Sequence, residues 1–173
     1  MNQSKLLLLI LVSIILVSCG TSHNYTSNNL NKSFYQGKSI YFKLNPKSQN
    51  QINFSGMVGT VLGGIIQPNV KETFKKSIEE LASETNLKLK FIENSEKLID
   101  KESIVFDTDI SEISWHFGFS IATLKTNVIY KNTNNGNEVI TNGIRKSGGG
   151  DEMNNLKKSL KDATFKFLKE LEK

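Results

Sequence analysis

The pattern of apolar and polar positions divides the chain into three parts. Residues 6–17 are apolar apart from Ser13, and residues 20–36 are mostly Ser, Thr, Asn and Lys with scattered Tyr and Phe. From Lys38 onward, apolar residues recur either at every second position or at spacings of three and four, which are the periods of strands and helices. The pattern predicts a single folded region, residues 37–173, preceded by two segments of different character.

Five segments of this region alternate between apolar and polar residues and are predicted strands. They cover residues 38–44, 87–91, 103–115, 119–130 and 138–144. Gly118 marks a bend between two of them. Asn134-Asn135-Gly136 is a turn signal suited to positive φ, so residues 128–131 should pair with 138–144 as a hairpin.

Two further segments are predicted amphipathic helices. Asn69 and Glu72 form an N-cap pattern for the first, which should end near Asn86, and Asp151 can cap the second. Their apolar faces contain Val70, Phe74, Ile78, Leu81 and Ala82 in the first and Met153, Leu156, Leu160, Ala163, Phe167 and Leu171 in the second. The order of elements predicts an α+β two-layer sandwich, with an antiparallel or mixed sheet of about five strands and both helices on one face.

The N-terminal residues have the parts of an export signal: one cation at Lys5, the apolar run, and a small residue at Ser18. The run is too short to span a bilayer, which takes roughly 20 apolar residues. Leu16-Val17-Ser18-Cys19 resembles the lipobox of substrates of the lipoprotein signal peptidase. That resemblance implies a bacterial lipoprotein: diacylglycerol on Cys19, removal of residues 1–18, and acylation of the new amino terminus. The alternative is an ordinary secretory signal that leaves Cys19 as a free thiol.

The residues after the cysteine bear on location and on the connection to the domain. Gly20 stands where an aspartate often holds lipoproteins in the inner membrane, so the resemblance implies the outer membrane. No acidic cluster of the kind that directs some lipoproteins to the cell surface follows, which favours the periplasmic side. Residues 19–36 are too polar to offset the entropy of ordering by burial, and they are predicted to form a flexible lipidated tether.

The charge of the mature chain is mild. Removal of residues 1–18 leaves 155 residues with 21 basic and 17 acidic groups, a net charge of +4, which does not indicate nucleic acid as a partner. The lysines are interleaved with acids, as on a solvated surface, although attraction to anionic lipid headgroups is an alternative. With Cys19 lipidated, no disulfide can form within the chain, so its stability must come from burial.

Two segments are candidates for binding. Glycines punctuate apolar residues in 54–66, which could be a loop over the core, an apolar flap that meets lipid or a partner, or an oligomerisation segment. Trp115, Phe117 and Phe119 alternate and should share one strand face, either in the core or as a binding patch, with His116 on the other face. The candidate contact residues are Met57, Val61, Ile65, Trp115, Phe117 and Phe119.

The sequence contains few residue patterns that are typical of catalytic or metal sites. His116 is the only histidine of the folded region, without further ligands at metal-binding spacing. Asp107 and Asp109 share a strand face, where they could form a carboxylate pair for acid–base chemistry or calcium binding. Paired acids on a solvent-facing strand are the simpler interpretation. The sequence has neither a Gly-x-Ser-x-Gly turn nor a phosphate-binding glycine loop. No catalytic residue, metal or cofactor is predicted.

From Lys38 to the C-terminus, the order of elements is similar to that of small outer-membrane lipoproteins of the YajG and LpoB type. The similarity lies in a strand before a glycine-containing loop and helix, a long meander, and a closing helix. It implies a non-enzymatic envelope protein that binds or scaffolds an envelope partner, and it transfers no site residues. The alternative is a periplasmic carrier or sensor of an apolar or lipid ligand, with a pocket lined by residues 57–66 and the Trp115 cluster. The oligomeric state is left open.

Overall fold

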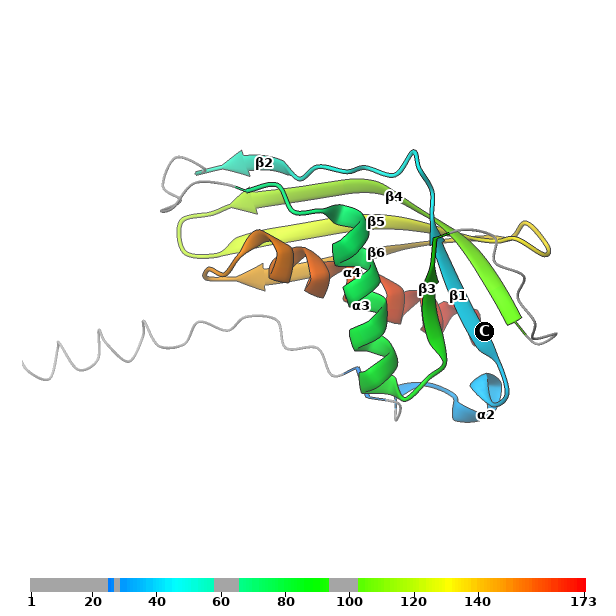
Figure 1. Cartoon of the computed structure of the whole chain (residues 1–173). Helices are drawn as coiled ribbons and strands as arrows, with labels where there is room; N and C mark the ends of the chain where they lie inside the picture. The colour runs from blue at the N-terminus through cyan, green and yellow to red at the C-terminus, as the bar shows by residue number, and fades with distance from the viewer. Residues whose placement is uncertain (1–24, 27–28, 58–65, 94–102) are drawn as a thin grey trace, which may run out of the picture.

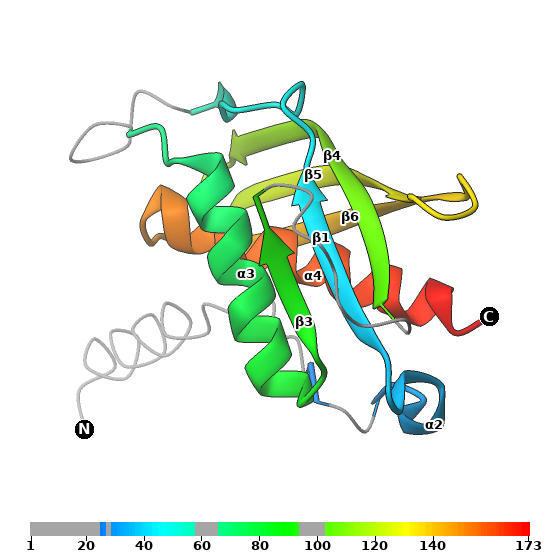
Figure 2. The same cartoon turned by 45° about the vertical axis from the view of Figure 1, so that its right-hand side comes forward.

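The computed structural model describes residues 25–26, 29–57, 66–93 and 103–173 as a two-layer α+β domain (Figure 1). One layer is an open, mixed sheet of six strands, and two long helices cover one of its faces (Figure 2). The elements are the helices α2 (Lys32–Tyr35), α3 (Val70–Thr85) and α4 (Glu152–Leu171) and the strands β1 (Ser39–Leu44), β2 (Asn53–Gly56), β3 (Leu89–Ile92), β4 (Ser103–Phe117), β5 (Ala122–Asn132) and β6 (Glu138–Ser147). The predicted α+β sandwich is confirmed, with one strand and one short helix more than the pattern indicates.

The first half of the chain runs beside one long strand, β4. The sheet order is β3-β1-β4-β5-β6, and β2 pairs with β4 beyond β1. Both β1 and β2 are parallel to β4, with Phe42 opposite Phe106 and Phe54 opposite Trp115. Backbone hydrogen bonds from the connecting loop to β4 keep the two strands aligned. This parallel edge, together with the antiparallel strands that follow, makes the sheet mixed.

β4, β5 and β6 form an antiparallel meander. Val128 lies opposite Thr141 and Lys131 opposite Glu138, so the predicted hairpin is confirmed. Gly136 in its turn has a φ of +75°, a conformation that glycine adopts without steric strain. β4 contains 15 residues, which at about 3.3 Å per residue gives a length of about 45 Å along the strand.

Both long helices begin at their predicted caps. The Asn69 side chain accepts a hydrogen bond from the Glu72 N–H at 3.0 Å, and the Asp151 carboxylate accepts one from the Asn154 N–H at 2.7 Å. These caps satisfy backbone donors that the first helical turn leaves free. The apolar faces pack toward the sheet as predicted, with the exception of Met153, whose side chain is exposed.

Aromatic rings fill the space between the helices and the sheet. Tyr130 and Phe167 are stacked with their ring centroids 4.1 Å apart, and Phe106 meets Phe167 edge-on at 4.7 Å. The Phe42 ring lies 5.9 Å from that of Tyr130. The Tyr130 hydroxyl and Thr164 Oγ1 are 2.9 Å apart, so the polar end of this buried tyrosine is hydrogen-bonded. The core is therefore built around contacts between β1, β4, β5 and α4.

Tyr25 and Tyr35 pack on α4, which corrects the prediction of a flexible tether for the described part of 19–36. Tyr25, Leu30 and Tyr35 are buried, and the Tyr35 hydroxyl donates to the Leu168 carbonyl at 2.6 Å. The Tyr25 ring meets that of Phe165 edge-on, with centroids 5.1 Å apart. A few large side chains within a polar segment are enough to dock it, because each buries a large apolar area. The folded domain therefore already includes Tyr25, while residues 19–24 and 27–28 lie outside the described part.

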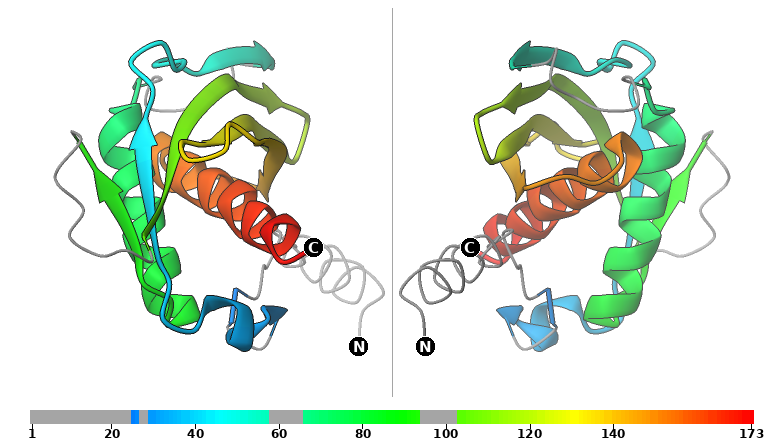
Figure 3. Two further views of the ribbon diagram at one scale, coloured as in Figure 1. Left: turned by 90° about the vertical axis from the view of Figure 1, so that its right-hand side faces the viewer. Right: turned by 90° about the vertical axis from the view of Figure 1, so that its left-hand side faces the viewer.

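Figure 3 shows how this docking orients the molecule. In both of its views, α2 and the described N-terminal residues lie on the lower side, beside the end of α3, and β2 lies on the upper side. The chain therefore enters the domain beside the end of α3, on the side away from β2.

Candidate functional site

Three aromatic rings form a cluster where β2 meets the end of β4. Trp115 and Phe117 project to the helix-covered face because alternate strand residues share a face, and their ring centroids are 4.8 Å apart. The parallel pairing of β2 adds Phe54, 6.1 Å from Trp115 and 6.2 Å from Phe117. Trp115 is 3% exposed. We call these three residues the aromatic cluster.

Phe54 is absent from the predicted cluster because β2 is absent from the predicted strands. The strand has only four residues and overlaps the start of the glycine-punctuated segment 54–66, for which the spacing predicts a loop, a flap or an oligomerisation segment but no strand. The one local signal for β2 is the run Ile52-Asn53-Phe54, in which apolar and polar residues alternate.

Phe119 does not share a face with Trp115 and Phe117, contrary to prediction. β4 ends at Phe117, and the Gly118 N–H donates to the Ile121 carbonyl at 3.1 Å to close a turn. The alternation therefore stops before Phe119, whose side chain is 95% exposed at the turn. A phenyl ring in that position has no structural role in the described core and is free to contact another molecule.

Most of the large exposed apolar side chains of the described chain gather around this turn. Met57 follows β2, and its N–H donates to the Phe117 carbonyl at 2.9 Å. The Ile66 N–H donates to the Glu152 side chain at 3.2 Å, which places it at the start of α4. The described ranges contain six exposed large apolar residues, and all but Ile140 lie at this end of the sheet. The five are Met57, Ile66, Phe119, Ile121 and Met153. We call this region the aromatic end.

A surface groove of about 390 Å³ runs between the turn 118–121, the glycine run 148–150 and Glu152. Trp115 and Phe117 form its aromatic wall. The Trp115 indole N–H is buried and has no hydrogen-bond partner among the described residues. A buried, unpaired donor costs about 1–3 kcal/mol.

Two of the candidate contact residues, Val61 and Ile65, lie outside the described residues, as does the whole of 58–65. The choice between loop, flap and oligomerisation segment for 54–66 therefore stays a prediction. Its described ends both reach the aromatic end, since Met57 bonds to β4 and Ile66 to α4. Cys19 likewise lies outside the described part.

His116 projects to the uncovered face of the sheet, as predicted, and is exposed. Its Nδ1 lies 3.2 Å from Ser55 Oγ, across the parallel pairing of β2 and β4. Gly56 passes so close that a Cβ there would come 2.9 Å from the imidazole Cε1. Within the described residues the ring has no carboxylate partner, so this hydroxyl–imidazole pair lacks the third group that orients a catalytic base.

The two aspartates of β4 lie on the same uncovered face. Asp107 stands in register between Lys43 and Lys131, and Asp109 accepts a hydrogen bond from Ser48 Oγ at 3.1 Å. Neighbouring cations and a hydroxyl therefore surround these carboxylates. No group of three or more His, Cys, Asp or Glu side chains in the described ranges is arranged to hold a metal ion.

Comparison with known proteins adds little to this geometry. No family model matches the sequence, and no curated protein matches it. One solved structure, described as that of an uncharacterized protein, aligns with 78% of this chain and 88% of its own, with a TM-score of 0.37 and 5% sequence identity. None of the helices in the described part combines the length and apolar character needed to cross a membrane.

Proposed function

We propose that this chain is a lipid-anchored cell-envelope protein whose domain is a non-enzymatic binding or scaffolding module for an envelope complex. The anchor is the lipid on Cys19, indicated by the lipobox Leu16–Cys19. The proposed location is the outer membrane, on the periplasmic side. The binding surface is the aromatic end, and the exposure of Phe119 is the observation that carries this assignment.

The shape of the aromatic end favours a protein partner. Phe119 lies on a turn that closes the end of the sheet, so its ring can enter a pocket on another surface. Large aromatic anchors surrounded by other apolar side chains are typical of the residues that dominate protein–protein binding energy. Met57 and Ile121, which are 45% and 44% exposed, would supply such surroundings.

A carrier or sensor of an apolar ligand is the second candidate, because Trp115 and Phe117 line a surface groove. Its volume of about 390 Å³ lies in the lower part of the range of roughly 300–1,000 Å³ typical of small-molecule sites. The aromatic core leaves the sheet and helices in direct contact, so a ligand would bind at the surface groove.

Site-specific photocrosslinking in intact cells tests the proposal. A photoreactive residue replaces Phe119 in one strain and Ile140 in another; Ile140 is a matched control, 69% exposed on the uncovered sheet face. We expect discrete protein adducts from position 119 that position 140 does not form, and we expect Cys19→Ala to abolish them. Equal adducts from both positions would contradict the proposal, and adducts with only lipids or small molecules would favour the carrier.

A further inference from the structure

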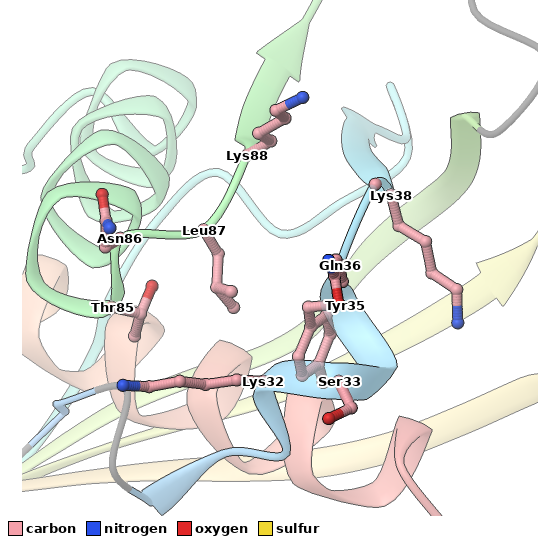
Figure 4. Close-up of a pocket in the computed structure, with 10 residues that line it drawn as sticks. Lys32, Ser33, Tyr35, Gln36, Lys38, Thr85, Asn86, Leu87 and Lys88 are labelled. Carbon is pink, nitrogen blue, oxygen red and sulfur yellow. The ribbon is translucent and has the colours of Figure 1, made fainter.

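A second groove, of about 420 Å³, lies between α2 and the end of α3, on the side where the chain enters the domain (Figure 4). Its walls include three lysines, Lys32, Lys38 and Lys88, and no acidic side chain. Ser33 and Asn86 add polar groups. We call this the basic groove.

The nearby carboxylates are already engaged. Glu84, next to the groove, pairs with the Lys161 ammonium at 2.8 Å, and Glu172 accepts the Asn31 N–H at 2.8 Å. The Lys38 ammonium lies 3.5 Å from the centroid of the Phe34 ring. None of the three groove lysines has an ion-pair partner among the residues that the structure describes.

We propose that the basic groove docks on the phosphates of anionic lipids in the membrane that holds the anchor. The inference rests on the proposed lipidation of Cys19. Six residue steps separate Cys19 from the docked Tyr25, and an extended chain spans at most about 3.6 Å per residue, or about 22 Å here. The side of the domain that carries α2, the lower side in Figures 1 and 3, is therefore within reach of the bilayer surface, and the groove is lined by α2.

The arrangement of the lysines favours a charged surface over one small anion. Figure 4 shows their ammonium groups pointing in three different directions around the groove, so they do not converge on a single phosphate. A lipid surface presents many headgroups, and each lysine held near it strengthens association by roughly fivefold. Docking in this way leaves the aromatic end, at the far end of β4 from β1, free for a partner.

Fluorescence quenching on vesicles tests the docking. The acylated protein with Ser33→Cys carries a fluorophore on its one unmodified thiol, since Cys19 is lipidated. It is reconstituted into phosphatidylcholine vesicles with or without phosphatidylglycerol and with a headgroup-linked quencher. The same label at Ser120→Cys, in the turn of the aromatic end, reports on the opposite end of β4.

We expect strong quenching at position 33 only with phosphatidylglycerol present, and weak quenching at position 120. The variant Lys32→Gln/Lys38→Gln/Lys88→Gln should weaken docking by up to about 100-fold and lose the quenching, as should salt near 1 M. The control Lys47→Gln/Lys75→Gln/Lys125→Gln removes the same charge elsewhere and should retain it.

The outcomes separate the two proposals. If the protein stays on the vesicles but position 33 is quenched equally in neutral and anionic vesicles, the docking alone is overturned. The same holds if the groove variant is quenched as strongly as the wild type. If inorganic phosphate changes the fluorescence of the position-33 label in neutral vesicles, the groove binds a soluble anion instead and the membrane docking is overturned. Protein that carries no acyl chain and leaves the vesicles overturns the anchor, and the docking with it.

Discussion

Gly143 of β6 lies directly beneath α4, and its replacement by alanine should destabilise the domain strongly. A Cβ at this position would overlap the carbonyl oxygen of Ser159 and come 2.7 Å from both the Ser159 carbonyl carbon and Thr126 Oγ1, whereas real Cβ contacts below 3.0 Å are essentially never seen. The Thr126 and Ser159 hydroxyl oxygens are only 3.1 Å apart, which confirms how closely helix and strand approach. α4 can pack this closely on β6 only because residue 143 is a glycine.

The size of the destabilisation by Gly143→Ala follows from the kind of clash. Because the clash is with helix backbone, no side-chain rotation relieves it, and α4 must move away from β6. That movement loosens the buried contacts of Leu160 and Ala163. Overpacking of this kind costs about 1–3 kcal/mol, and a backbone clash belongs at the upper limit, about 3 kcal/mol. For a domain of this size the melting temperature should fall by about 6–12 °C.

Thermal unfolding followed by circular dichroism measures the effect, with Gly149→Ala as the matched control. A Cβ on Gly149 meets nothing within 4 Å, so that variant should melt within about 2 °C of the wild type. If Gly143→Ala also melts within about 2 °C of the wild type, the close contact between α4 and β6 is not present in solution.

Three further variants test other parts of the account. Tyr35→Phe removes the hydrogen bond that holds α2 to α4 and should cost about 1–2 kcal/mol in chemical denaturation, while leaving the helix content by circular dichroism unchanged. Burial raises the pKa of Glu80, but the hydrogen bonds and charges of Lys157 and Lys161 outweigh it, so the pKa lies below its ordinary value. A lowered carboxylate pKa adds stability above the unfolded pKa that disappears as the pH falls through the folded pKa, so Glu80→Gln should destabilise the protein at about pH 7 and much less at about pH 3. Phe119→Ala should leave the melting temperature unchanged because the ring is exposed, but should reduce recovery of the partner in pull-downs from cells.

Local signals predicted the elements that depend on local chemistry. The caps at Asn69 and Asp151 and the turn around Gly136 act within a few residues, so the pattern located both long helices and the hairpin correctly. The parallel pairing of β1 and β2 with β4 joins residues 61 to 64 positions apart. Neither the periodicity of apolar residues nor the turn-forming residues indicate such a distant pairing.

The same distinction explains the candidate site. Trp115 and Phe117 are close in sequence and follow strand alternation, so the pattern grouped them correctly, while Phe119 was misplaced because alternation ends where Gly118 turns the chain. The burial of Tyr25 and Tyr35 depends on the surface of α4, more than 130 residues away for each. A composition typical of a flexible linker could not reveal it.

The most direct test of the lipid anchor is the intact mass of the mature protein purified from membranes, together with the mass of its N-terminal peptide. The lipobox predicts a chain that begins at Cys19 and carries a thioether-linked diacylglycerol and an acylated amino terminus, with both lost in Cys19→Ala. A chain released without lipid, or a peptide with a free thiol at Cys19, would contradict the account.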